Sequence, residues 1–490
     1  MSKLIGRANE QAALAAALDS PEAELVAIYG RRRVGKTFLV REFFKPRADL
    51  FFEFTGQKDA SLSQQLFNFK DRLEQTFYQG TPIPRLASWN EAFRTLAQVV
   101  KVKTEQAPDN NIVIFLDELP WMATPRSRLL QALDYTWNTE LSQLSQVTLI
   151  VCGSAASWMI DNLIQAKGGL HNRITRQIRL MPFTLTETRA YFKHRKMKFG
   201  LKSVIELYMA LGGIPHYLRQ VESSKSASQN ISSLCFSPQG SLTTEFERLY
   251  DSLFGESEIY DKITRILANT QQGLTRDELI EQLGVHSGGS INRRLKELQE
   301  AGFITRMTPY NKSTKHTVFR VIDPYTLFYL RWIEKAPKGV FTRTNPNYWT
   351  NKYQTAGYKS WAGYAFENLC LTHSHLVAKA LGIDNVLAQA GNWNYRSPLH
   401  SKTQEGAQID LLFDRTDNTI TLCEIKYHVS PFSVNKSYAK ELKRKIEVFE
   451  HITRTKKDIR VVMITLNGFK ENTWSIDLVD QSIDADSIFS

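Results

Sequence analysis

Residues 30–37 combine glycines, a lysine and a threonine at a spacing that suits phosphate binding. The pattern is G-x-x-x-x-G-K-[ST], and it lies between an apolar run and a helix-like segment. Glycines let backbone N–H groups close around phosphate oxygens, and the following helix N-terminus adds positive potential. We therefore expect ATP and Mg²⁺ as cofactors, with the lysine on the phosphates and the threonine hydroxyl on the metal. A glycine turn that binds nothing is disfavoured by the flanking strand and helix. The residues are Gly30, Arg31, Arg32, Arg33, Val34, Gly35, Lys36 and Thr37.

A second group of chemically capable residues follows the apolar run at 112–116. This run ends in Asp117 and Glu118, the arrangement of a Walker B strand. We expect Asp117 to bind Mg²⁺ through water and Glu118 to act as the catalytic base on the attacking water. A further apolar run at 147–153 ends at Ser154, which is expected to sense the γ-phosphate or to position the attacking water. The alternative is a serine that simply ends the strand in a turn.

Acidic residues near the C-terminus form a third group. Asp410 lies inside an apolar stretch, and Glu424-x-Lys426 follows fourteen residues later, which is the pattern of a PD-(D/E)xK nuclease core. Residues i and i+2 of a strand share a face, so Glu424 and Lys426 project together, and a hairpin brings Asp410 beside them. Asp410 and Glu424 are then expected to hold Mg²⁺, with Lys426 acting on the attacking water. Glu367, on a predicted helix, matches an additional catalytic carboxylate of this fold.

Two features next to this group concern its substrate and activity. A basic helical segment is expected to face a nucleic-acid backbone. Its cations are Lys436, Lys440, Lys443, Arg444 and Lys445. Ile409 precedes Asp410 where the motif has proline. The alternative to a nuclease is a domain that keeps the fold and holds DNA without cleaving it.

The elements that position these residues are readable from periodicity. Strands expected at 25–29, 50–54, 112–116 and 147–153 alternate with helical stretches, which predicts a doubly wound α/β fold with a parallel sheet. Residues 258–322 predict a winged helix-turn-helix, with helices at 259–268, 275–283 and 290–301 and a wing hairpin from 303–305 and 317–321. The third helix and the basic wing tip at 311–316 either contact DNA, or this domain packs against the ATPase module as a lever.

Over nearly its whole length the chain resembles the P-loop ATPases of the AAA+/STAND kind, in particular a group abundant in archaea and also found in bacteria. The resemblance rests on residues 5–7, 29–37, 117–121 and 212–218. It implies that Arg7 lies at the nucleotide edge and that Pro215, in a helical lid, packs near the adenine. A nuclease-like C-terminal domain is a familiar companion in this group.

Arginine roles stay open at two places. Arg173 matches the position of an arginine that reaches a neighbouring subunit's nucleotide, with Arg176 and Arg179 as competitors, and a solvated surface role is the alternative for each. The loop arginines 31–33 are either solvated or face a polyanion.

Bulk properties agree with a nucleic-acid partner. The chain has 490 residues and a net charge of +12, which suits a partner rich in phosphate. DNA is the partner expected first, and homo-oligomer formation is left open. Four widely spaced cysteines lack metal-binding spacing, and no apolar run or signal peptide indicates a membrane. We therefore expect a cytoplasmic protein without a membrane partner.

These observations predict four domains: a P-loop ATPase domain (1–190), a helical lid (191–257), a winged helix (258–335) and a restriction-endonuclease-like α/β domain (336–490). The predicted function is ATP hydrolysis with nucleotide-gated, Mg²⁺-dependent phosphodiester cleavage. The first alternative is an ATP-dependent signalling switch whose C-terminal domain binds DNA or a protein without cleavage. The second is an ATP-driven remodeller that acts as an oligomer.

Overall fold

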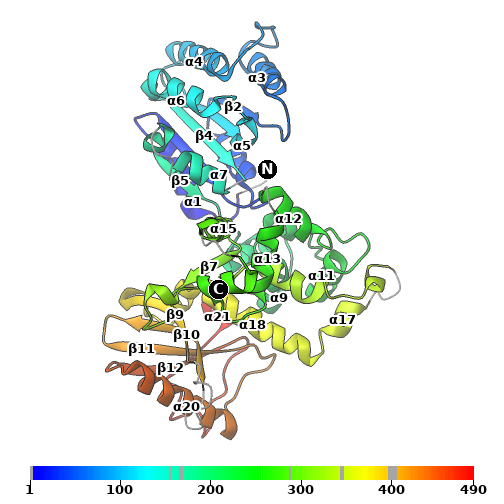
Figure 1. Ribbon diagram of the computed structural model, residues 1–490, viewed down its shortest axis with the longest axis vertical. Helices are drawn as coiled ribbons and strands as arrows, with labels where there is room; N and C mark the ends of the chain where they lie inside the picture. The colour runs from blue at the N-terminus through cyan, green and yellow to red at the C-terminus, as the bar shows by residue number, and fades with distance from the viewer. Residues whose placement is uncertain are drawn as a thin grey trace.

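The computed structural model describes residues 4–154, 156–164, 169–254, 257–285, 289–342, 347–395 and 406–489. Figure 1 shows one sheet with its helices at one end of the molecule, a second sheet at the other end, and a largely helical region between them. Within the described residues no helix combines the length and the hydropathy needed to cross a bilayer.

The first sheet is parallel throughout and has the strand order β2-β3-β4-β1-β5. Its strands are β1 (Glu24–Tyr29), β2 (Leu50–Thr55), β3 (Ile112–Asp117), β4 (Val147–Gly153) and β5 (Arg176–Arg179). The four strands predicted from the sequence are confirmed, because continuous apolar runs are what a sheet covered on both faces requires. The short edge strand β5 was not predicted.

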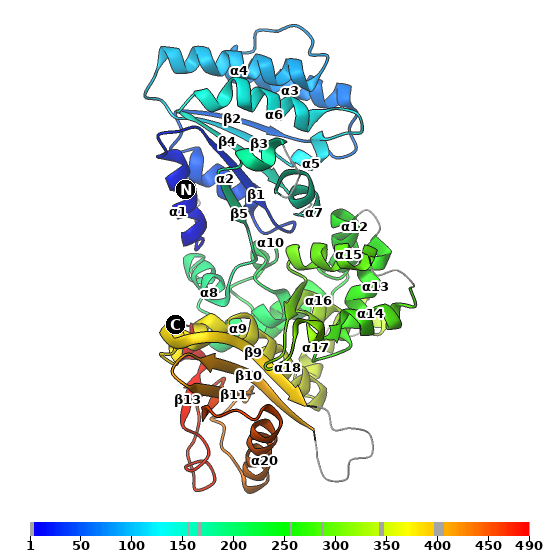
Figure 2. The ribbon, with the colours of Figure 1, turned by 60° about the vertical axis from the view of Figure 1, so that its left-hand side comes forward.

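Alternate residues of β1 enter two different cores, one on each face of this sheet. Val26 and Ile28 pack with α1 (Ala8–Leu18) and α2 (Lys36–Phe44), whereas Leu25 and Ala27 pack with the helices of the opposite face. Those helices are α3 (Leu62–Phe77), α4 (Trp89–Gln106) and α6 (Leu129–Thr139). The doubly wound α/β arrangement is therefore present (Figure 2).

The middle of the chain is helical and contains one small antiparallel sheet of order β6-β8-β7. Helices α8 (Leu185–His194), α9 (Leu201–Leu211), α10 (Pro215–Leu218), α11 (Ala227–Cys235) and α12 (Glu245–Leu253) come first. They are followed by α13 (Ser257–Ala268), β6 (Leu274–Thr275), α14 (Arg276–Leu283), α15 (Gly289–Glu300), β7 (Ile304–Met307) and β8 (Val318–Val321). The predicted capping box is present, since Thr275 and Glu278 exchange hydrogen bonds at the start of α14.

The C-terminal sheet has the order β13-β12-β11-β10-β9, with β9, β10 and β11 antiparallel and β11, β12 and β13 parallel. Its strands are β9 (Leu387–Tyr395), β10 (Ala407–Arg415), β11 (Thr419–Lys426), β12 (Asp458–Thr465) and β13 (Gln481–Asp484). The helices that matter for the site are α16 (Pro324–Phe328), α18 (Ala356–Thr372) and α20 (Lys436–Thr453). One continuous apolar core runs from α2 through the middle helices to α18 and β11.

Candidate nucleotide site and candidate nuclease site

The loop between β1 and α2 needs its glycines for two different reasons. Gly30 has φ 146°, and a Cβ there would lie 2.3 Å from the Leu180 carbonyl oxygen. Gly35 has φ 95°, caps α2, and has open space where a Cβ would point. Gly30 is therefore required by close packing and by backbone conformation, and Gly35 by conformation alone.

Lys36 and Thr37 lie where the sequence predicted them, at the start of α2. The Lys36 ammonium donates hydrogen bonds to the carbonyl oxygens of Gly30 (2.9 Å) and Arg31 (3.0 Å), so it closes the loop on itself. The Thr37 hydroxyl donates to Asp117 Oδ2 at 2.8 Å. A hydroxyl and a carboxylate side by side supply the hard oxygen ligands that Mg²⁺ prefers, so these two residues fit the expected metal.

Glu118 and Ser154 are paired across neighbouring strands. Glu118 Oε2 accepts hydrogen bonds from the Ser154 hydroxyl (2.8 Å) and from the Ser154 backbone N–H (3.0 Å). Glu118 also has φ 51°, in the left-handed region, directly after β3. Ser154 thus positions the predicted base, a role that lies between the two alternatives weighed from the sequence.

Arg7 and Pro215 have different environments. Arg7 is buried, donates from its backbone N–H to Glu187 Oε1 (2.7 Å) and from its guanidinium to the Val34 carbonyl (3.3 Å). Pro215 begins α10 and is half-buried. The position expected for Pro215 beside an adenine stays a prediction.

The three loop arginines have three different environments. Arg31 is fully buried, and its guanidinium forms an ion pair with Asp323 at 2.6 Å and lies over the Phe303 ring. Arg33 forms an ion pair with Glu245 at the start of α12, and Tyr217 of α10 donates to the same carboxylate at 2.9 Å. Arg32 is exposed. The expectation that these arginines are solvated or face a polyanion is therefore wrong for Arg31 and Arg33, because both are bound to the middle region.

The three arginines considered as contacts to a neighbouring subunit's nucleotide also have different environments. Arg176 pairs with Glu24 at 3.0 Å, and Arg179 donates to the Glu300 carbonyl at 3.0 Å at the end of α15. Arg173 is exposed. Of these three, Arg173 is the one whose surroundings leave it accessible to a neighbouring molecule.

The C-terminal acids gather at one end of the second sheet. Leu411 pairs with Cys423 in the antiparallel register of β10 and β11, so Asp410 falls opposite Glu424. Asp410 Oδ2 accepts the Ile425 backbone N–H at 3.0 Å, and Lys426 Nζ lies 3.5 Å from Glu424 Oε2. The structure therefore brings Asp410, Glu424 and Lys426 together, as the hairpin argument required.

Electrostatics at this end of the sheet are dominated by buried carboxylates. Burial, followed by the neighbouring Glu424 and Glu367 charges, raises the pKa of Asp410 to about 7. Burial also raises the pKa of Glu367, although Arg320 and Lys426 act against it. Two raised carboxyl pKa values in one cluster are the pattern expected of a functional site.

Glu367 reaches this cluster from α18 but is also bound from the middle region. Arg320, on β8, is 2% exposed, lies 3.4 Å from Glu367 Oε1, and has its guanidinium over the Tyr364 ring. Glu367 thus lies beside the other three residues of the cluster and carries an ion pair that the sequence did not indicate.

Two further residues of the cluster come from α20 and were missed. Lys445 Nζ lies 2.8 and 2.9 Å from the two Glu424 carboxylate oxygens, and the Tyr438 hydroxyl donates to Glu424 Oε2 at 2.8 Å. Assigning Lys445 to the nucleic-acid-facing surface was therefore wrong. The signal was available, because Lys445 shares the buried stripe of α20 with Leu442 and Phe449 at helical spacing. Lys436, Lys440 and Lys443 are exposed, and Arg444 is half-buried.

The third helix and the β7–β8 connection contact neighbouring parts of the chain. Helix α15 lies against the first sheet's domain, where Arg179 donates to the carbonyl oxygens of Gln299 and Glu300. Tyr310 donates its N–H to the Asn392 carbonyl (3.2 Å), and Asn311 donates to the Thr453 carbonyl (3.4 Å). These contacts are the kind expected if this region packs against the ATPase module as a lever, because they tie it to both ends of the molecule.

Comparison with known protein families supports an ATPase assignment for the first part of the chain. Residues 4–221 match the model of an ATPase domain found predominantly in Archaea. This region is therefore an archaeal-type ATPase domain of the P-loop NTPase class.

Proteins that are similar over most of this chain have low sequence identity to it. An uncharacterised protein of Methanocaldococcus jannaschii is 25% identical over 437 residues, which is 86% of this chain and 87% of that protein. A Walker-type ATPase of Pyrococcus abyssi is similar over 67% of this chain and 96% of its own, with 19% identity and a TM-score of 0.48. The Aeropyrum pernix ORC2 protein is similar over 68% and 94%, with 16% identity and a TM-score of 0.41.

Proposed function

We propose that the protein is a cytoplasmic ATPase that acts on nucleic acid and cleaves phosphodiester bonds at its C-terminal domain under control of bound nucleotide. The ATPase part is carried by residues 4–221. The observation that carries the rest is the meeting of Glu367, Asp410, Glu424 and Lys426 at one end of a single sheet. The lid (191–257), the winged helix (258–335) and the nuclease-like domain (336–490) belong to this proposal.

In the cleavage step the chain's own residues bind and orient. Asp410 and Glu424 would supply oxygen ligands for Mg²⁺, which would stabilise charge on the phosphodiester and lower the pKa of a bound water. Lys426, whose Nζ lies 3.5 Å from Glu424 Oε2, would orient the attacking water. Among the described residues no three His, Cys, Asp or Glu side chains enclose a metal by themselves. Mg²⁺ commonly takes one or two carboxylates and completes its coordination shell with water and substrate phosphate. Two carboxylates are therefore enough protein ligands for a site of this type.

Basic surfaces support a nucleic-acid partner. A groove beside α14, α15 and β7 is lined by four cations and two acids, Arg276, Lys296, Arg306, Lys315, Asp277 and Glu300, so its lining is basic on balance. Three exposed lysines lie on α20, the helix that also carries Tyr438 and Lys445 of the acidic cluster. Cations spread along a surface suit a phosphate backbone, and the net charge of +12 points the same way.

The gating part of the proposal rests on residues 320–323. Asp323 holds Arg31 of the phosphate-binding loop, and Arg320, three residues earlier, holds Glu367 of the acidic cluster. The Ile322 N–H donates to the Phe303 carbonyl (2.9 Å), and the Phe303 ring lies under Arg31. This segment therefore contacts both sites. In the proposed gating, nucleotide binding displaces Arg31, and the ion pair with Asp323 passes this displacement to Arg320, which holds Glu367.

The test is a cleavage assay with single- and double-stranded DNA, Mg²⁺ or Mn²⁺, with and without ATP. We expect metal-dependent cleavage by the wild type and its loss in Glu424→Ala and Lys426→Ala. Lys379→Ala, an exposed change in the same domain and outside both the acidic cluster and α20, is the matched control. Equal cleavage by all four proteins would remove the proposed site. ATP turnover measured against protein concentration, with Arg173→Ala, tests homo-oligomer formation.

A second candidate function is favoured by one specific observation. The Glu424 carboxylate is fully engaged by Lys445, Tyr438 and Lys426. This arrangement suits a switch in which ATP controls the binding of DNA or a protein and nothing is cut. DNA affinity that falls steeply with salt, without cleavage in any metal, would favour this candidate over the first.

A further inference from the structure

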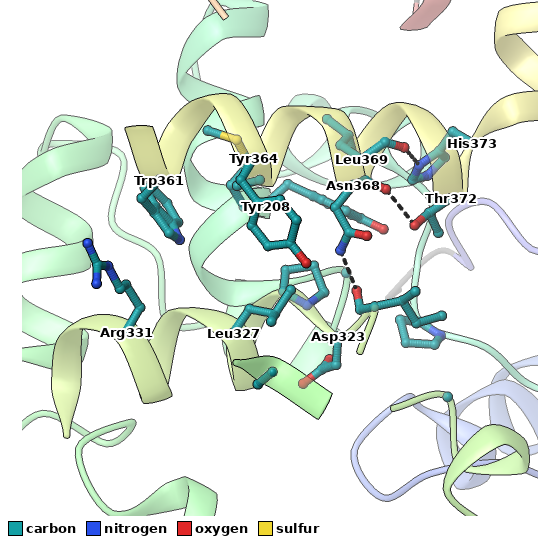
Figure 3. A pocket seen from close by; sticks show the side chains of 18 of the residues that line it. Tyr208, Asp323, Leu327, Arg331, Trp361, Tyr364, Asn368, Leu369, Thr372 and His373 are labelled. Atoms are coloured by element: carbon teal, nitrogen blue, oxygen red, sulfur yellow. Dashed lines mark hydrogen bonds between the residues drawn. The ribbon is translucent and has the colours of Figure 1, made fainter. Parts of the chain in front are cut away.

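A cavity of about 500 Å³ lies where the ATPase domain, the middle region and the C-terminal domain meet. One wall is the face of α18 that carries Trp361, Tyr364 and Asn368, and the opposite wall is α16 with the turn that follows it. Figure 3 shows Arg331 beside Trp361 at one end, and Asn368 and Asp323 toward the other. Cavities of this size at domain junctions are common positions for small-molecule sites.

Asn368 gives this cavity an unmet hydrogen-bonding requirement. The residue is 4% exposed, and its amide nitrogen faces the Ile322 carbonyl at 3.5 Å. Its Oδ1 atom is buried and has no hydrogen-bond partner among the residues that the structure describes. A buried acceptor left unpaired is unfavourable, so a ligand that brings an N–H or O–H donor is stabilised there.

The other polar residues of the cavity set the remaining chemistry. His373 is not free, because its Nδ1 lies 2.9 Å from the Leu369 carbonyl and its Nε2 accepts the Leu185 N–H at 3.2 Å. The Tyr208 hydroxyl donates to the Phe183 carbonyl, which leaves its ring as apolar wall. Arg331 and Lys335 are exposed and place positive charge at the Trp361 end.

The separation of the two ends limits the ligand. Trp361 and Asn368 are seven residues apart on α18, which corresponds to about 10 Å along the helix. A ligand that satisfies both ends has a donor-bearing flat ring against Tyr364 and Tyr208 and an anionic group near Arg331. A nucleoside monophosphate has this composition, since its ribose separates an amino-bearing base from its phosphate.

We propose that this cavity binds a nucleoside monophosphate, with the base donating to Asn368 and the phosphate on Arg331 and Lys335. The site is separate from the phosphate-binding loop. Asp323 lines it and holds Arg31, so occupancy bears on the loop through that ion pair. The proposal does not depend on cleavage, since binding is measured directly.

The experiment is calorimetric titration of the full-length Lys36→Ala protein, in which the phosphate-binding loop is disabled, with AMP, GMP and CMP. We expect saturable binding of at least one of them, weakened about tenfold by Asn368→Leu, which removes one hydrogen bond. Arg331→Ala is expected to weaken the same nucleotide but not the corresponding free nucleoside. Lys338→Ala, an exposed change outside the cavity, is the matched control.

Two results would overturn the proposal. One is the absence of binding by all three nucleotides. The other is binding whose affinity is unchanged by both Asn368→Leu and Arg331→Ala. The thermal midpoint of each variant without ligand is measured in parallel. Because Asn368→Leu removes an unpaired buried acceptor and fills a similar volume, we expect this variant to remain folded.

Discussion

Arg31 of the phosphate-binding loop forms a fully buried ion pair with Asp323, which lies 292 residues further along the chain. Asp323 is also the cap of α16, where it accepts the Thr326 N–H at 3.0 Å and the Thr326 hydroxyl at 2.7 Å. The loop that should contact nucleotide phosphates is thus tied to the segment that leads into the C-terminal domain.

Arg31→Ala should destabilise the protein without nucleotide, because it leaves the Asp323 carboxylate buried without a cation. Removing one partner of a buried pair commonly costs about 3–5 kcal/mol. Chemical unfolding of the nucleotide-free protein measures this loss. Arg32→Ala, one position along on an exposed side chain, should change stability by about 0.5 kcal/mol or less. Equal effects of the two substitutions would contradict the role given to Asp323.

Glu118→Gln should abolish ATP hydrolysis while ATP binding is retained. The amide cannot take a proton from water, and loss of a general base commonly lowers the rate by about 100-fold or more. Ser154→Ala should lower turnover less, since the Ser154 backbone N–H still donates to Glu118. Turnover and ATP affinity are measured for both variants. A Glu118→Gln protein with wild-type turnover would remove Glu118 from the mechanism.

Much of the ATPase site was predictable because its chemistry is local in sequence. Residues 30–37 fix a strand, a glycine loop and a helix start within one short stretch, and Asp117 follows a strand that is apolar throughout. The hairpin that brings Asp410 to Glu424 was predictable for the same reason. Strand periodicity and a short turn determine its register.

The contacts between domains were not predictable in this way. Nothing near Asp323 or Glu245 in the sequence marks them as partners of loop arginines, because those pairs form only when distant surfaces pack. Arg320 is a similar case. A charged residue in a short strand is expected to face solvent, and only the packing of α18 against the strand buries this one. Lys445 differs, because its place on the apolar stripe of α20 was visible.

The unfolding free energy of Asp410→Asn should rise relative to that of the wild type as pH rises. The folded-state pKa of Asp410 is raised to about 7, whereas an unfolded chain has an aspartate pKa of about 4. Between these values the folded protein holds a proton that the unfolded chain has released, so this residue's contribution to stability falls as pH rises through the window.

The measurement for Asp410 is the unfolding free energy of wild type and Asp410→Asn at pH 5 and pH 8, without divalent metal. The variant should gain on the wild type at pH 8. Asp384→Asn, an exposed change in the same domain, controls for the loss of one carboxylate. A gain at pH 5 that disappears at pH 8 has the wrong sign and would contradict the assignment.

Lys445→Met should lower the thermal midpoint in EDTA, because Glu424 then loses the cation that contacts both of its oxygens. Added Mn²⁺ should recover more stability in this variant than in the wild type, since the metal takes the place of the ammonium. Thermal scans with and without Mn²⁺ measure both effects, with exposed Lys443→Met as the control. Equal Mn²⁺ effects in all three proteins would show that Glu424 does not contact the metal.

The most direct test of the whole account is the rate of DNA cleavage with Mn²⁺, with and without ATP, for wild type and Asp323→Asn. Within the part of the chain that the structure describes, Asp323 bonds to Arg31 and Thr326 and not to the acidic cluster, so it joins Arg31 to the segment that carries Arg320. We predict that ATP changes the wild-type rate and that Asp323→Asn cleaves at a rate indifferent to ATP. The exposed change Asp384→Asn, outside both sites, should behave like the wild type. An equal response to ATP in wild type and Asp323→Asn, or no cleavage by any of these proteins, would contradict the account.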